Sequence, residues 1–202
     1  MAATDLLLFT AHCDDAELWA GGTITRLARN GGRVCVAIAN HDPTRRREAE
    51  LSARILGYEV TFHEGSAGSL AWAQDVLEST APDVLMTHPV ADPHFEHARL
   101  GATIIEALTK SLHRKAYPRR WYAYDTYYST TSEGFSLLID ISDEFETKAS
   151  ALRCHKSQQP DELVAMARSM NSLNGQRIRA SYAEAFQPFP LLGRWPRLRD
   201  LP

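Results

Sequence analysis

The stretch LLLFTAHCDDAEL, residues 6–18, joins an apolar run directly to a cluster of polar side chains. An apolar run of this length, ended by polar residues, is typical of a strand that is buried on both faces of a parallel sheet. Ligands of open α/β sheets bind just beyond the carboxyl ends of such strands. We therefore expect His12, Asp14 and Asp15 at the place where this class of fold does its chemistry.

The rest of the chain alternates between strand-like and helix-like segments. The expected strands are residues 6–10, 34–39, 58–63, 83–87, 120–128 and 136–141. The expected helices are residues 17–30, 44–56, 71–79, 95–110, 143–154 and 161–180, and the tail from residue 187 is expected to be irregular. Four successive strand–helix units predict an α/β fold with a mostly parallel sheet and right-handed crossovers, and we expect one domain over residues 1–202.

Composition limits the classes of function. Hydrophobic residues make up 44% of the 202 residues, and the formal net charge is −3, so neither a nucleic acid nor an anionic membrane is an expected partner. The three cysteines are widely spaced, which favours reduced thiols and a cytoplasmic location. No segment reads as a signal peptide or as a membrane span.

A second polar cluster, THPVADPHFEHARLG, begins at the end of the fourth expected strand. Imidazole and carboxylate groups together are good ligands for zinc or another divalent metal. His12 and Asp15 from the first cluster and His97 from the second would supply three ligands. Asp14 would then accept a proton from an activated water, and His94, one helical turn before His97, would contact an oxyanion or the leaving amine.

Other interpretations of these residues exist. A lone histidine is more often structural than catalytic, and either aspartate could simply cap the following helix. A nucleotide-dependent oxidoreductase of Rossmann type would need G-x-G-x-x-G straight after the first strand. Gly21 and Gly22 come too late for that motif, and adjacent carboxylates would repel a pyrophosphate.

Five segments, in order along the chain, resemble the LmbE-like or PIG-L family of zinc-dependent N-deacetylases. AHCDDAELWAGGT is similar to the AHPDDE-type opening of the family, and His94-Phe-Glu96-His97 to its H-x-D-H motif. The other three segments are Arg45-Arg-Arg-Glu48 with the following helix, the stretch DISDEFETKASALRCHKSQ (residues 140–158) and SYAEAF (residues 181–186).

The resemblance implies a Rossmann-like fold and a metal-dependent hydrolase that removes an acyl group, commonly acetyl, from the nitrogen of an amino sugar or related small molecule. It implies the same ligands and the same roles for Asp14 and His94, with Zn²⁺ as the cofactor. It also indicates a substrate-binding group, which we assign to Arg45, Glu48, Glu96 and His155; for His155 a structural role is an equal alternative.

Two departures from the family pattern leave an alternative open. Cys13 stands where the family usually has proline, and Glu96 stands where it usually has aspartate. A catalytically weak or non-enzymatic metal-binding member of the family is therefore the second hypothesis. The oligomeric state, a homo-oligomer included, is left open by the sequence.

Overall fold

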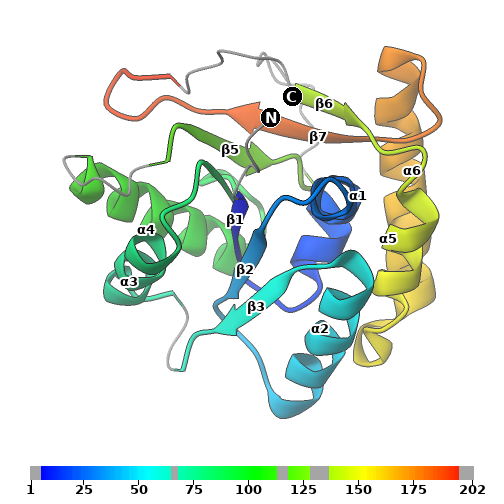
Figure 1. The fold of residues 1–202 in the computed structure, drawn as a ribbon, viewed down its shortest axis with the longest axis horizontal. Coiled ribbons are helices and arrows are strands. Elements are labelled where there is room, and N and C mark those ends of the chain that lie inside the picture. Colours follow the sequence, from blue (N-terminus) through cyan, green and yellow to red (C-terminus); the bar gives the residue numbers. More distant parts are fainter. Residues whose placement is uncertain (1–5, 65–67, 113–117, 128–136, 196–202) are drawn as a thin grey trace.

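The computed structural model describes residues 6–64, 68–112, 118–127 and 137–195 (Figure 1). Its centre is one seven-stranded sheet with the strand order β3-β2-β1-β4-β5-β7-β6. The strands are β1 (Leu6–Thr10), β2 (Val34–Ile38), β3 (Glu59–Phe62), β4 (Val84–Thr87), β5 (Arg120–Tyr124), β6 (Leu137–Asp140) and β7 (Ala183–Pro188). The helices are α1 (Asp15–Arg29), α2 (Pro43–Leu56), α3 (Leu70–Thr80), α4 (Phe95–Ser111), α5 (Phe145–Leu152) and α6 (Pro160–Ile178), with a short 3₁₀ helix η1 (Lys156–Gln158).

The sheet is mixed, with mostly parallel strands, as the sequence predicts. Strands β3, β2, β1, β4 and β5 are parallel to one another, whereas β7 runs antiparallel to both β5 and β6. Every expected strand and helix is present, although the strand expected at residues 120–128 ends at Tyr124 and residue 128 lies outside the described part.

Strand β7 is a correction to the sequence prediction. It runs from Ala183 to Pro188, so the tail is not irregular from residue 187 onward. The segment AEAFQP contains no β-branched residue and places the charged Glu184 within the strand, where it is fully buried. It therefore lacks the composition by which strands are recognised in a sequence.

Helices cover both faces of the sheet (Figure 1). Alternate residues of β1 divide between the two layers, as the two-residue period of a strand requires. Leu6 and Leu8 pack with α1, α2 and α5, whereas Leu7 and Phe9 pack with α3 and α4. All four side chains are buried, which explains why this stretch reads as one continuous apolar run.

A buried ion pair, with the hydrogen bonds around it, connects helices α5 and α1 to strand β7 at the antiparallel edge of the sheet. Lys148 of α5 donates to Glu184 of β7 over 2.7 Å, and both side chains are fully buried. The Lys148 ammonium also donates to Asn171 over 2.7 Å. The Glu184 carboxylate accepts the backbone N–H groups of Gly22 and Thr23 and the Thr23 hydroxyl at 2.7–2.9 Å. These contacts fix the helix that begins with Asp15.

Candidate metal centre and active site

The strand order brings the two polar clusters of the sequence together. Strands β1 and β4 are hydrogen-bonded neighbours with Leu6 opposite Val84, so their carboxyl ends lie at the same edge. Helix α4 begins a few residues beyond β4, and its Gly101 packs closely on the backbone of His88 and Pro89, which directly follow that strand. A Cβ atom at Gly101 would lie inside the van der Waals radius of the His88 carbonyl oxygen. The absence of a side chain at Gly101 therefore lets α4 carry His97 up to the end of β1.

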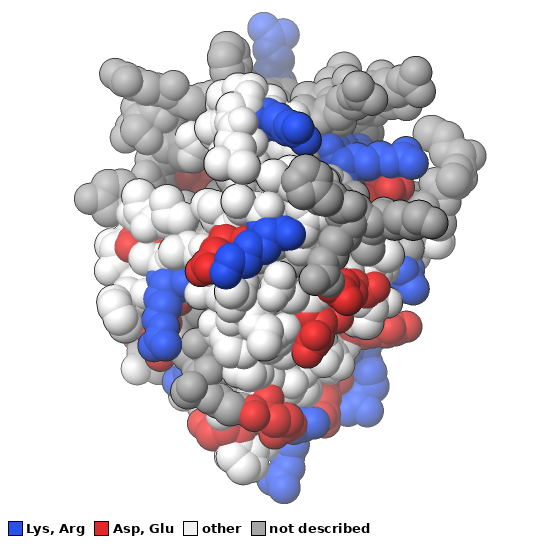
Figure 2. Space-filling view, turned by 90° about the vertical axis from the view of Figure 1, so that its left-hand side faces the viewer, with Lys and Arg blue, Asp and Glu red and all other residues white. Residues whose placement is uncertain are grey.

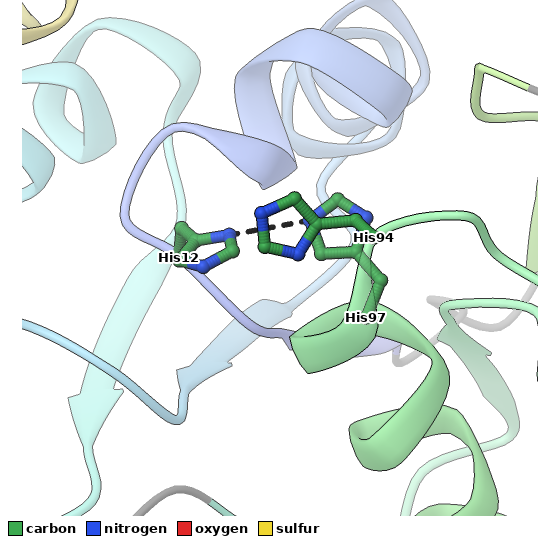
Figure 3. Close-up of side chains that lie close together, drawn as sticks. All are labelled: His12, His94 and His97. Atoms are coloured by element: carbon green, nitrogen blue, oxygen red, sulfur yellow. Dashed lines mark hydrogen bonds between the residues drawn. The ribbon is translucent and has the colours of Figure 1, made fainter.

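The three predicted metal ligands converge on one point. His12 follows β1 and faces His94 and His97 at the start of α4 (Figure 3). The Nδ1 atom of His12 lies 3.2 Å from Nε2 of His97 and 3.4 Å from Oδ2 of Asp15. The Nε2 atom of His97 lies 3.3 Å from Oδ1 of Asp15. Ligands bound tetrahedrally at 2.0–2.1 Å would be roughly 3.3 Å apart, so this donor set fits a zinc-type ion.

Neighbouring carboxylates hold the outer nitrogens of both ligand histidines. Nδ1 of His97 lies 3.2 Å from Oδ2 of Asp92, which also accepts the Thr126 hydroxyl over 2.6 Å. Nε2 of His12 lies 2.6 Å from Oε2 of Glu96. Such contacts fix the tautomer and the orientation of a metal-binding imidazole. They leave Nδ1 of His12 and Nε2 of His97 for an ion.

Asp15 is held from three sides. Its Oδ2 accepts the backbone N–H of His12 over 2.7 Å and lies 3.1 Å from Nε2 of His88, and its Oδ1 accepts the Trp19 indole N–H over 3.2 Å. His88 is buried and its ring stacks on that of His97 at 3.9 Å between centroids. Neither His88 nor Asp92 has a role predicted from the sequence, although both belong to the second polar cluster.

Two overlapping groups of described side chains have the spacing for a metal ion, one made by His12, His94 and His97 and the other by Asp15, His88 and His97. Both groups contain His97, and together they contain all three predicted ligands. His94 therefore lies within reach of the same point, with its ring 4.5 Å from that of His97 and 4.9 Å from that of His12.

The close spacing of histidines and carboxylates shifts the pKa values of these groups in the metal-free site. Burial opposes protonation of His12 and His97, but hydrogen bonds and charge from carboxylates outweigh it and raise the pKa of each to about 9. Burial and the adjacent charge of Asp15 raise the pKa of Asp14. Burial and the neighbouring histidines lower the pKa of His94, which favours its neutral form.

Asp14 and His94 both border open space. Asp14 occupies the N-cap position of α1, yet its side chain makes no capping hydrogen bond, so the helix-cap interpretation does not account for it. It lines a cavity of about 180 Å³ together with Asp15, His97 and His94. His94 and His12 also border a second cavity of about 420 Å³. A carboxylate, an imidazole and the ligand set thus share one space.

The four predicted substrate-binding residues separate into two groups. Arg45 lines both cavities and donates to Gln158 over 2.7 Å, and Glu96 lines the larger cavity. Glu48 does not line either cavity; its carboxylate accepts the backbone N–H and the hydroxyl of Ser157 at 2.9 and 2.6 Å. His155 is fully buried, with Nε2 3.4 Å from Oε2 of Glu17. The last two residues therefore support the walls rather than line the cavities.

Cys13 lies in the apolar core beneath the loop. Burial, followed by the charges of Asp14 and Glu17, raises the pKa of its thiol, which stays protonated at neutral pH. Its Sγ points to the backbone carbonyl of Asn40 at 3.8 Å. The replacement of the family's proline by Cys13 therefore adds a packed side chain, and among the described residues this thiol belongs to neither group that has the spacing for a metal ion.

Comparison with known families agrees with this arrangement. The chain matches the PIG-L family, described as GlcNAc-PI de-N-acetylase, over residues 7–108, slightly more than half of its length. The chain therefore belongs to the PIG-L family. The matched region contains every predicted ligand, Asp14 and His94.

Solved structures share the fold over almost the whole chain. The N,N'-diacetylchitobiose deacetylase from Pyrococcus horikoshii is 24% identical, with a TM-score of 0.78 over 95% of this chain and 85% of that one. The conserved protein TT1542 from Thermus thermophilus is 25% identical, with a TM-score of 0.76 over 93% and 95%. GalB, the 4-carboxy-2-hydroxymuconate hydratase from Pseudomonas putida, is 20% identical, with a TM-score of 0.76 over 93% and 97%.

The outer surface gives less information about partners. On the face shown in Figure 2, basic and acidic side chains are interspersed among uncharged ones. Among the described residues, no helix combines the length and the apolar character that a membrane crossing requires. The absence of a nucleic-acid partner and the cytoplasmic location stay predictions.

Proposed function

We propose that this protein is a metal-dependent N-deacetylase that hydrolyses the N-acetyl group of an amino sugar or a related small molecule. The observation that carries the proposal is the ligand set His12, Asp15 and His97, with donor atoms 3.2–3.4 Å apart and Asp14 bordering the same cavity. Membership of a family described as de-N-acetylases supports it, as does the likeness to a chitobiose deacetylase.

The metal would be held by Nδ1 of His12, Nε2 of His97 and the Asp15 carboxylate, a two-histidine, one-carboxylate set of the type that hydrolytic zinc sites use. When bound, a Zn²⁺ ion polarises an amide carbonyl and lowers the pKa of water toward about 7. Glu96 and Asp92 keep the two imidazoles in the required orientation, through contacts of 2.6 and 3.2 Å.

Asp14 would act as the general base. Its side chain makes no capping hydrogen bond and borders the same cavity as the ligand set, where it can reach a water. It would take a proton from water as the water attacks the amide carbon, and then pass that proton to the leaving nitrogen. His94, which lines the same cavity, would donate a hydrogen bond to the oxyanion that forms on the substrate.

The alternative of a non-enzymatic member rested on Cys13 and Glu96, and both are accommodated. Cys13 packs into the core, and Glu96 reaches His12. The likeness to a hydratase is a different matter, because it means that the fold by itself does not decide between hydrolysing an amide and adding water to a double bond. Only the products distinguish these reactions.

The decisive experiment compares wild-type protein with Asp14→Asn on a panel of N-acetylated amino sugars, measuring free amine and acetate together with bound metal. We expect unchanged metal content and a turnover lower by about 10²–10⁴-fold, the usual contribution of a general base. Asp161→Asn, at an exposed position in the first turn of α6, is the matched control and should behave as wild type.

Two results would count against the proposal in different ways. Near-normal acetate release by a metal-loaded Asp14→Asn variant would remove Asp14 from the role of base. Absence of any amine release by metal-loaded wild-type protein across the panel would refute the deacetylase function itself.

A further inference from the structure

Two cavities meet at the candidate centre; both are lined mainly by polar groups, and they differ in a few of the residues that border them. Every residue that lines the larger one, of about 420 Å³, is polar: His12, Asn40, His41, Asp42, Arg45, His94 and Glu96. The smaller one, of about 180 Å³, is also mainly polar, with Asp14, Asp15, His97 and Gln158 beside the three residues that it shares with the larger one. It differs in that Leu18 and Tyr127 also border it. Apolar side chains therefore face the reactive groups only on the side of the smaller cavity.

Aromatic contacts hold Tyr127 in place at the edge of the smaller cavity. Its ring lies parallel to that of His97, within 11° and at 6.1 Å between centroids, and meets the ring of Trp19 edge-on at 5.0 Å. Trp19 is itself fixed by its hydrogen bond to Asp15. Burial, with the nearby carboxylates, raises the pKa of Tyr127 to about 12, so the phenol is uncharged at neutral pH.

The chemistry of amide hydrolysis gives the two cavities different roles. The amide carbon must lie next to Asp14 and the ligand set, and its two substituents, the acyl chain and the amine part, diverge from it in different directions. An acyl chain is apolar and gains from contact with Leu18 and Tyr127. A sugar is covered with hydroxyl groups, which need the donors and acceptors that line the larger cavity.

We infer that the smaller cavity is the acyl subsite, that Tyr127 and Leu18 limit the length of the acyl chain, and that the larger cavity takes the amine part of the substrate. This inference rests on the proposed deacetylase function. Leu18 is buried in the core, whereas Tyr127 is half exposed. Tyr127 is therefore the residue whose removal lengthens the subsite without opening the core.

The test measures kcat/KM for a matched series of N-acetyl, N-propionyl and N-butyryl amino sugars. In wild-type protein we expect acetyl to be preferred by about tenfold for each added methylene, the discrimination that a limit on chain length can give. Tyr127→Ala should raise the ratio of butyryl to acetyl by at least about tenfold. Tyr127→Phe, which keeps the ring, should leave that ratio close to the wild-type value.

A control and a binding measurement complete the design. His41→Ala, in the wall of the larger cavity only, should raise KM for all three substrates and leave their ratio unchanged. Calorimetric binding of the uncleaved substrates to Asp14→Asn protein should show the same rise in the butyryl-to-acetyl ratio when Tyr127→Ala is added.

The possible failures are separable. Hydrolysis of N-acetyl substrates with a butyryl-to-acetyl ratio that Tyr127→Ala does not change, or that His41→Ala changes instead, would overturn the subsite assignment and leave the deacetylase function standing. Absence of hydrolysis of the whole series by metal-loaded wild-type protein would overturn both.

Discussion

The buried pair Lys148–Glu184 allows a sharp prediction about stability. Lys148→Met removes the ammonium group and keeps a flexible apolar chain in the same space. It leaves the carboxylate of Glu184 buried with its three α1 donors, from Gly22 and Thr23, but without a counter-charge, and it leaves Asn171 without its donor. Breaking a buried ion pair from one side costs about 3–5 kcal/mol.

Lys148–Glu184 differs from an isolated buried ion pair because Glu184 also accepts hydrogen bonds from α1. A variant that replaces both residues tests this difference. Replacing both members of an isolated pair by apolar residues is often neutral or stabilising. Here the carboxylate of Glu184 also accepts from α1, so Glu184→Leu deprives the Thr23 hydroxyl of its acceptor, at about 1–3 kcal/mol for an unsatisfied buried group. Lys148→Met combined with Glu184→Leu should therefore remain less stable than wild type.

Urea denaturation measures these differences through the midpoint and slope of unfolding. Lys110→Met is the matched control, because Lys110 also lies 2.7 Å from a carboxylate, that of Glu106, but both side chains are about half exposed. An exposed helical pair of this kind contributes about 0.3–0.5 kcal/mol. The free energy of unfolding of a domain is typically about 5–15 kcal/mol, so Lys148→Met should remove a large fraction of it.

The reasoning would be refuted by a Lys148→Met variant as stable as the Lys110→Met control, which would mean that the carboxylate of Glu184 does not need its counter-charge. Full recovery of wild-type stability in the double variant would refute the second step, the need of α1 for the Glu184 carboxylate.

Two further predictions concern the metal. The raised pKa values of His12 and His97, each about 9, stabilise the metal-free protein below pH 6.5, and this contribution is lost as the pH rises through 9. Because a metal competes with these protons, the rise in Tm on adding Zn²⁺ should grow from pH 6.5 to 9. The affinity for the metal should increase by about tenfold per pH unit for each proton displaced. A rise in Tm that does not depend on pH would contradict this. Glu96→Gln should weaken metal binding by about 10–100-fold in chelator competition, since Glu96 orients His12. Asp42→Asn, in the same cavity wall, is the control, and equal affinities for the two variants would show that Glu96 does not orient the ligand.

Much of the centre could be predicted because it depends on short segments at strand ends. The apolar run of β1 locates its own carboxyl end, and the run before His88 locates that of β4. What the sequence could not supply was the pairing of these two strands, since the chain between them also forms β2 and β3. The neighbouring positions of β1 and β4 turn two separate clusters into one ligand set.

The residues that the sequence prediction missed act through contacts made across the fold. Asp92 reaches His97 five positions further on, where the chain has turned into α4, and Tyr127 reaches the same histidine from beyond the end of β5. No periodicity or spacing marks such residues, because their partners are set by tertiary packing. His88 could have been noticed, since it directly follows an apolar strand, much as His12 follows its own.

The late motifs show why residue type and family likeness do not by themselves identify a catalytic group. Lys148, His155 and Glu184 belong to segments that resemble the family, and a lysine, a histidine and a glutamate could each take part in hydrolysis. All three side chains are fully buried and lie beside other charged groups rather than in a cavity. Their charges hold α1, α5 and β7 together, which keeps Asp14 and Asp15 at the start of α1 in register with His97. Such residues influence catalysis through the position of the helix, so their substitution should affect folding before it affects chemistry.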